Sequence, residues 1–195
     1  MKTITASVGA MLGAMLVLCS LGLAQAPTST PTKDEKKTVS QVLDSGIKIV
    51  EGDFVPAAEA MPEEKYGFAP TNGEFKGVRT FAEQIKHVAA INYIVAAMIL
   101  GEKPPVDTNG EKGPESAKSK ADILKFLKDS FAYAHKAVAT ITDANALEPI
   151  PNPFGQAKTT RLSLGSVFPW HGFDHYGQMV EYLRMNGIVP PASRQ

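Results

Sequence analysis

Apolar residues recur at intervals of three and four in four separate segments of the chain, a spacing typical of amphipathic helices. The segments cover about residues 38–61, 80–101, 119–141 and 163–186. Loops rich in proline, glycine and polar residues separate them, and none of the segments alternates as a strand does. Four amphipathic helices joined by loops of moderate length predict an all-α domain, a four-helix bundle.

Capping residues mark where three of these helices should begin. A threonine or serine is followed three residues later by a side chain that can accept a bond from the backbone N–H of that threonine or serine, as in a capping box. The pairs are Thr38 with Gln41, Thr80 with Glu83, and Ser119 with Asp122.

Two prolines complicate the helical patterns. Pro56 lies within the first pattern and suggests a kink or break there. The last helix can begin at Ser163 or Ser166, and Pro169 favours the later start because proline is tolerated in a first helical turn. At the other end of this helix, Gly187 is a candidate C-cap.

Residues 1–24 have the features of a signal peptide. Lys2 provides a positive start, apolar or small residues follow, and small residues permit cleavage after Ala24 or Ala26. The apolar run is too short and too small in side chain for a membrane anchor, which needs roughly 20 strongly apolar residues. We therefore expect an exported protein, periplasmic or extracellular, with no stable membrane insertion after cleavage.

A disordered linker and one folded domain are expected to follow the leader. Residues 25–37 are rich in proline, threonine and charge, and residues 38–193 are enough for one domain with a core. The chain has 20 basic and 20 acidic residues, a balance that argues against nucleic-acid binding. Cys19, the single cysteine, lies in the leader, so the mature domain offers no thiolate.

Histidines are the residues most suited to chemistry in this sequence. His171 and His175 are four residues apart, so both rings leave the same helix face and can reach one metal ion. His87 borders the apolar stripe of the second helix, and facing helices of a bundle commonly build cofactor sites. Three histidines with an open fourth position match catalytic zinc, and imidazole also suits nickel, iron or copper. The spacing alone also permits a polar helix edge or a buried histidine with a backbone partner.

Four other polar residues are weighed beside these histidines. His135 is interpreted as a boundary residue of the third helix rather than a fourth ligand. Glu83 lies one turn before His87 and can orient its ring, although its place in a capping box favours a structural role. Gln178 and Tyr182 lie near the face of the two C-terminal histidines and are candidates for an outer-shell or substrate contact.

Three stretches of the sequence resemble the DinB-like family, also called DinB/YfiT-like. They are FAEQIKH at 81–87, HGFDHYGQ at 171–178 and YLRMNGIVPP at 182–191. The resemblance extends over residues 38–193. It implies an up-down-down-up bundle with a three-histidine metal site, which by position would consist of His87, His171 and His175.

The same resemblance implies one bound divalent ion, most often zinc or nickel in this family, and a homodimer. Several branches of the family are hydrolases or S-transferases that use a low-molecular-weight thiol in the cytoplasm. The predicted export removes that co-substrate, so thiol transfer is not expected here.

The function predicted from the sequence is a metal-dependent hydrolase or transferase acting on an unknown small-molecule substrate. The alternative is a non-catalytic metal-binding or stress-related protein of the cell envelope. A third hypothesis is an interaction module in which the histidines only fill space.

Overall fold

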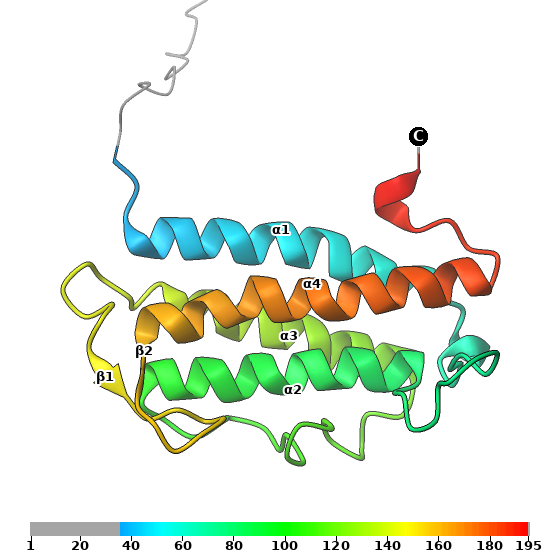
Figure 1. Cartoon of the computed structure of the whole chain (residues 1–195), viewed down its shortest axis with the longest axis horizontal. Coiled ribbons are helices and arrows are strands. Elements are labelled where there is room, and N and C mark those ends of the chain that lie inside the picture. Colours follow the sequence, from blue (N-terminus) through cyan, green and yellow to red (C-terminus); the bar gives the residue numbers. More distant parts are fainter. Residues whose placement is uncertain (1–35, 195) are drawn as a thin grey trace, which may run out of the picture. The chain divides into compact units, whose positions relative to one another are not determined.

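The computed structural model describes residues 36–194, which form four long helices packed side by side (Figure 1). A short antiparallel pairing of two-residue strands precedes the last helix. The elements are α1 (Val39–Ala60), α2 (Phe81–Leu100), α3 (Lys120–Val138), β1 (Pro149–Ile150), β2 (Thr159–Thr160) and α4 (Arg161–Met185), with short 3-10 helices at Glu63–Lys65 and Pro191–Ser193. The predicted four-helix bundle is confirmed.

The predicted signal peptide, residues 1–24, lies outside the described residues. So does the predicted linker, except for Lys36 and Lys37, which are exposed and precede α1. Among residues 36–194, no helix is both long enough and apolar enough to cross a membrane.

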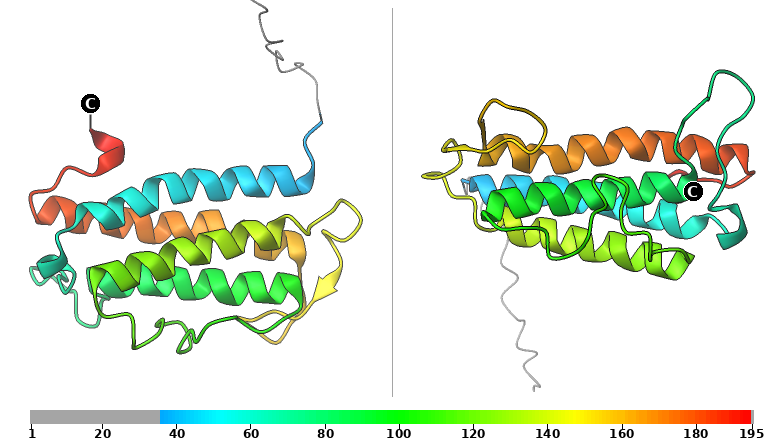
Figure 2. Two further views of the ribbon diagram at one scale, coloured as in Figure 1. Left: turned by 180° about the vertical axis from the view of Figure 1, so that it is seen from behind. Right: turned by 90° about the horizontal axis from the view of Figure 1, so that it is seen from below.

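The helices follow the up-down-down-up order. On α4, Pro169 lies against Gly46 of α1, and Gly172 lies against Val50 of α1, so these two helices run parallel. Tyr182, near the end of α4, bonds to the carbonyl just before α2 begins, so α2 runs antiparallel to α4. In the two views of Figure 2, α2 and α3 lie side by side and run in the same direction.

Three helix starts agree with the capping pairs read from the sequence. α1, α2 and α3 begin after Thr38, Thr80 and Ser119, and in each case both hydrogen bonds of the capping box are present. These bonds satisfy backbone N–H groups that have no partner within the helix. Local sequence therefore determines where these helices begin.

The expected start of α4 at Ser163 or Ser166 is wrong. Its N-cap is Thr160, whose side-chain oxygen accepts a bond from the Ser163 N–H at 3.1 Å. Pro169 consequently lies inside the helix, where its missing N–H removes one backbone bond. Its ring packs against Gly46 of α1, where an added Cβ would lie only 3.4 Å from the ring. A packing partner from another helix thus accommodates a proline that local rules place in a first turn.

Two further features of the helices differ from the sequence patterns, the path of α1 at Pro56 and the end of α3. α1 continues through Pro56 without a break and ends at Ala60. The carbonyl that Pro56 leaves without a helical partner belongs to Gly52, an exposed position where water can bond to it. α3 ends at Val138, not at Ile141, which nevertheless lies buried in the core after the helix has ended.

The C-terminus of α4 agrees with the glycine read as its cap. Gly187 has φ +74°, a left-handed conformation that glycine adopts without strain. The N–H of Ile188 bonds to the carbonyl of Leu183 and that of Gly187 to Arg184, both at 2.9 Å, which is the Schellman pattern.

Small residues bring α4 unusually close to α1. A Cβ added at Gly172 would lie 2.6 Å from Val50, and one added at Gly165 would lie 2.8 Å from Leu43. At these distances a neighbouring side chain would have to move if either residue carried a Cβ, so glycine permits the close approach of the two helices. With one face of α4 fixed against α1 in this way, the neighbouring face is turned toward α2.

Candidate metal centre

The face of α4 that is turned toward α2 carries His171 and His175, which are one helical turn apart. His175 is buried and His171 is partly buried. Because Gly172 lies between them on the side that contacts α1, the close packing of α1 and α4 fixes the direction in which the two rings point.

His87 reaches the same point from α2. Its side chain is 6% exposed, within a helix whose inward face is otherwise mostly apolar. The connection between α2 and α3 contacts it, because the Glu111 carbonyl lies 2.9 Å from Nδ1 of His87. Gly113 of the same connection, at φ +72°, lies against the neighbouring Lys86. An added Cβ at Gly113 would lie 3.0 Å from the Lys86 side chain, so this close approach also depends on glycine.

The three imidazoles meet edge to face. The ring centroid of His87 lies 5.1 Å from that of His171 and 4.8 Å from that of His175. The centroids of the two α4 histidines are 4.6 Å apart. Nε2 of His171 lies 3.2 Å from Nε2 of His87. One ligand atom from each residue falls within 4.8 Å of the others, so the group is able to hold a single metal ion.

Two of the rings have their outer nitrogens fixed by oxygen acceptors. Nδ1 of His87 lies 2.9 Å from the carbonyl of Glu111, and Nδ1 of His175 lies 2.5 Å from Oε1 of Gln84. Because carbonyl oxygens only accept, each Nδ1 carries the proton and donates it. Each Nε2 is therefore left with a free lone pair, and this is how outer-shell partners orient metal-binding histidines.

Burial keeps the rings uncharged. Desolvation is the largest cause, and it lowers the pKa of His171 to about 3 and that of His175 to about 4, with nearby histidines adding to the effect. The pKa of His87 is lowered as well, again mainly by burial. Neutral imidazole is the form that binds metal ions, so at neutral pH no proton has to leave before an ion can bind.

The donor set fits a divalent ion. Two neutral nitrogens whose lone pairs face each other at 3.2 Å repel unless a proton or a cation lies between them. Nitrogen ligands at the usual zinc distance in tetrahedral geometry are separated by about 3.3 Å. In addition, Nδ1 of His171 is buried and has no hydrogen-bond partner within residues 36–194, so no protein group orients this ring through that nitrogen.

One known family matches the segment that carries the three histidines. Residues 47–179, which include all three histidines, match the DinB superfamily. The chain belongs to the DinB superfamily. Comparison with curated proteins gave no match.

Two solved structures share the DinB fold of this chain. A DinB-like protein from Bacillus cereus is 15% identical, with a TM-score of 0.61, over 80% of this chain and 98% of that one. YfiT from Bacillus subtilis, described as a probable metal-dependent hydrolase with an unusual four-helix bundle topology, is 19% identical. Its TM-score is 0.57 over 82% of this chain and 94% of that one. At these identities the likeness establishes the fold.

The structure places the other candidates of this DinB site at different distances from the histidines. Gln178 accepts a bond from Nε2 of Gln84 at 2.8 Å, so it contacts His175 through one intermediate residue. Glu83 is exposed and bonds to both the N–H and the hydroxyl of Thr80, which completes the cap of α2.

Tyr182 is buried and is used in packing. Its hydroxyl donates to the carbonyl of Arg79 at 3.0 Å, and its ring packs edge to face against Phe68. These contacts attach the end of α4 to the segment before α2, and none of them is to a histidine.

Gln84 is the residue that sequence reasoning missed. It is 1% exposed and links His175 to Gln178. Its signal in the sequence is an amide three residues before His87, on a helix face that is otherwise apolar.

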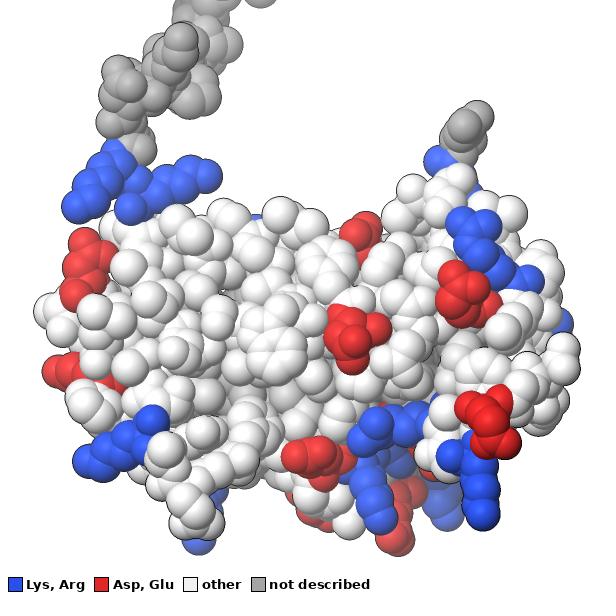
Figure 3. Space-filling model, in the orientation of Figure 1, with Lys and Arg blue, Asp and Glu red and all other residues white. Residues whose placement is uncertain are grey.

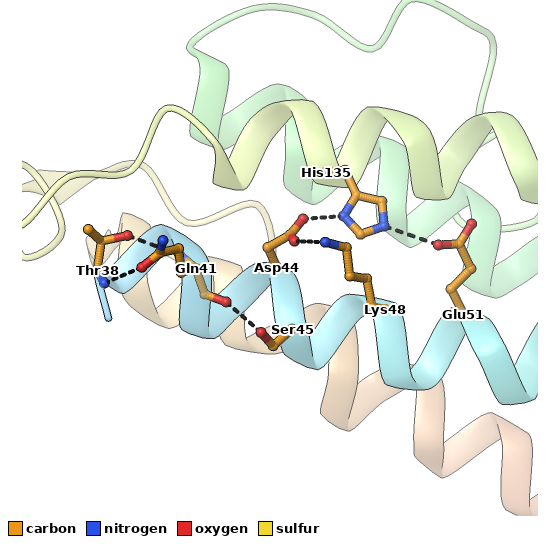
Figure 4. A network of polar contacts seen from close by, with 7 residues as sticks. All are labelled: Thr38, Gln41, Asp44, Ser45, Lys48, Glu51 and His135. Atoms are coloured by element: carbon orange, nitrogen blue, oxygen red, sulfur yellow. Dashed lines mark hydrogen bonds and ion pairs between the residues drawn. The ribbon is translucent and has the colours of Figure 1, made fainter. Parts of the chain in front are cut away.

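His135 lies on the other side of the bundle, between α3 and α1. Nδ1 is 2.6 Å from Asp44 and Nε2 is 3.0 Å from Glu51, while Asp44 also pairs with Lys48 (Figure 4). With both ring nitrogens bonded to carboxylates, this histidine has no nitrogen free for a metal ion, in agreement with its interpretation as a boundary residue.

A cavity of about 200 Å³ opens onto the histidine cluster. It is lined by His87, Ile91, Glu111, Phe154, Val167, Trp170 and His171. A larger cavity of about 540 Å³ lies near the start of α2, where Arg79, Lys86 and Lys112 line it together with Glu83, and no histidine does. Figure 3 shows charged side chains gathered below the N-terminal half of α2, whereas the face over α1 and α4 carries few.

Proposed function

We propose that this protein is a metal-dependent hydrolase or transferase that acts on a small molecule, with one divalent ion held by His87, His171 and His175. The observation that carries the proposal is the convergence of three neutral imidazoles on one point beside a cavity. No carboxylate or fourth histidine within residues 36–194 completes the cluster. Three protein ligands with a remaining open position are the arrangement of catalytic sites, whereas structural zinc usually has four.

A bound zinc or nickel ion would supply Lewis acidity and a water of lowered pKa. The residues of the chain have separate tasks around it. The Glu111 carbonyl and the Gln84 amide hold the rings of His87 and His175 in place, and Gln178 fixes the orientation of the Gln84 amide.

The alternative function, a non-catalytic metal-binding or stress-related envelope protein, has one observation in its favour. Within residues 36–194, no carboxylate is among the metal-binding group, and the acid that lines the adjoining cavity, Glu111, is outside that group. In the catalytic proposal, the proton is taken up within the cavity, by Glu111, by the substrate or by solvent.

Metal content and cobalt spectroscopy test these functions. We expect one equivalent of zinc or nickel per chain, and a cobalt-substituted protein whose visible absorption changes when azide is added. The azide response reports a coordination position that an external ligand can occupy. A cobalt spectrum that azide does not change would favour the non-catalytic alternative, and absence of stoichiometric metal would exclude both.

We also propose that the protein is exported, on the basis of residues 1–24. The mature N-terminus, sequenced from protein made in its native host, should begin after Ala24 or Ala26. Recovery of the protein with Met1 intact in the cytoplasm would exclude export, and would reopen thiol transfer as a reaction.

A further inference from the structure

Apart from the two histidines, the cavity beside the metal site is lined by apolar side chains and by one exposed acid, Glu111. Ile91 of α2 and Val167 of α4 form the interior wall and are almost fully buried, at 4% and 7% exposure. Phe154 and Trp170 form the outer part of the lining. His87 and His171 line the same cavity, so a molecule within it lies directly beside the proposed ion.

The two aromatic side chains of the lining are exposed to solvent, which is unfavourable for apolar surface. Trp170 is 59% exposed and Phe154 is 47% exposed, although both have large apolar surfaces. Trp170 precedes His171 on α4, and the two ring centroids are 6.0 Å apart. Phe154 comes from the connection between β1 and β2, so two distant segments contribute aromatic rings to one opening. Exposed apolar groups gathered at a cavity commonly mark a binding site.

The charge of the cluster limits what can bind to the ion. All three candidate ligands are imidazoles, which bind a metal ion in their neutral form, so none of the ligand atoms offsets the charge of a divalent ion. An oxygen donor that can become anionic offsets this charge better than a neutral one. The cavity volume of about 200 Å³ is below the 300–1,000 Å³ typical of sites for drug-sized ligands, so the occupant is a small molecule.

We infer that the substrate is a small molecule with an oxygen donor for the ion and an aromatic group for the cavity, where the group packs between Phe154 and Trp170. This inference rests on the proposed metal site and names the substrate class of that site. The aromatic group shields apolar surface that is otherwise exposed, and it holds the reacting oxygen next to His87 and His171.

A pair of hydroxamates tests the inference in the zinc-loaded protein. Benzohydroxamate and acetohydroxamate share a metal-binding group and differ in a phenyl ring against a methyl group. We expect benzohydroxamate to bind at least about tenfold more tightly, because the ring buries more apolar area. Calorimetry gives both affinities. Trp170, the single tryptophan of the chain, also reports occupancy directly through its fluorescence.

Two phenylalanine variants provide the matched comparison. Phe154→Ala should reduce the preference for benzohydroxamate several-fold and leave the affinity for acetohydroxamate unchanged. Phe173→Ala should leave both affinities unchanged, because Phe173 is 37% exposed on α4, packs against Tyr176 and does not line the cavity. Zinc content, measured for each variant, shows that the metal site is intact.

The outcomes separate the inference from the function on which it rests. If zinc binds in one equivalent but the two hydroxamates bind equally well, the inference is overturned and the metal site stands. An equal loss of preference in Phe154→Ala and Phe173→Ala also overturns it. If the protein takes up no zinc, the proposed function fails first, and the inference fails with it.

Discussion

Histidines are placed at two helix contacts of this bundle, and the two contacts treat them in opposite ways. Between α2 and α4, three imidazoles meet with no carboxylate among them, and burial lowers the pKa of each. Between α1 and α3, His135 stands alone and bonds to Asp44 and Glu51 through both ring nitrogens. The first contact gathers ring nitrogens that can bind one cation, and the second gathers carboxylates around a histidine.

The difference shows that neighbours decide what a histidine does. The outer nitrogen of His87 donates to a backbone carbonyl and that of His175 donates to an amide, which leaves their inner nitrogens as free acceptors. His135 has a carboxylate against each of its two ring nitrogens. The same side chain therefore offers a metal ligand at one contact and a bridge between helices at the other.

Removal of one ligand should have the largest effect. His171→Ala leaves two imidazoles, and we expect zinc affinity to fall more than about 100-fold, beyond the loss typical of outer-shell changes. His135→Ala is the matched control and should bind zinc as the unmodified protein does. Calorimetry with zinc measures both variants. Equal losses in the two variants would contradict the division between the contacts.

Removal of the amide that orients His175 should have the next largest effect. Gln84→Leu retains the size of the side chain but offers no acceptor to Nδ1, and we expect zinc affinity to fall about 10–100-fold. Gln178→Leu should have a smaller effect, because Gln178 acts through Gln84. A Gln84→Leu variant with unchanged affinity would show that His175 needs no orienting partner.

The close packing behind the α4 histidines should be sensitive to one methyl group. In Gly172→Ala, the new Cβ would lie 2.6 Å from Val50, and we expect a loss of about 1–3 kcal/mol in unfolding free energy. Gly177→Ala is the control on the same helix, since nothing lies within 4 Å of a Cβ there. Because glycine in a helix interior is unfavourable, Gly177→Ala should raise the unfolding free energy by about 0.5–1 kcal/mol. Urea titration of the metal-free variants measures both changes.

The two contacts should lose stability in different pH ranges. In metal-free protein, the folded pKa values of His171 and His175, about 3 and 4, lie below the usual value of about 6.5. The unfolded chain then takes up protons first, so stability falls as pH decreases from about 6.5 toward 4, by at most about 1.4 kcal/mol per pH unit for each proton. His171→Leu should reduce this slope in urea titrations at a series of pH values.

At the other contact, the Lys48 bond and His135 lower the pKa of Asp44 from 3.8. The stability that Asp44 provides is therefore present above pH 3.8 and is lost only as the pH falls below that value. Asp44→Asn should therefore reduce the loss of stability that urea titration detects as the pH falls below 3.8. A slope below pH 3.8 that the substitution does not change would contradict this role of Asp44.

Disruption of the His135 contact should have the smallest effect. Its side chain is 24% exposed and its carboxylate partners are more exposed, so we expect His135→Leu to change unfolding free energy by about 1 kcal/mol or less. Thermal unfolding of the variant measures this. A loss above 3 kcal/mol would mean that the network in Figure 4 holds α1 and α3 together far more strongly than exposed ion pairs do.

The sequence predicted the features that depend on neighbouring residues. The three capping boxes, the glycine cap at Gly187 and the facing of His171 and His175 follow from spacing along a helix. Gln84 was missed because its importance depends on α4, which is distant in the sequence. The start of α4 was predicted wrongly because Pro169 is accommodated by Gly46 of another helix.

The sequence by itself determined the number of helices, the fold class and the pair of histidines on one helical turn, since periodicity and capping act over a few residues. Only the tertiary structure decided that His87 meets that pair, that Gln84 and Glu111 orient two of the rings, and that His135 is held by carboxylates instead. The physical reason is packing. Glycines fix α4 against α1, and this contact sets which face of α4 is turned toward α2.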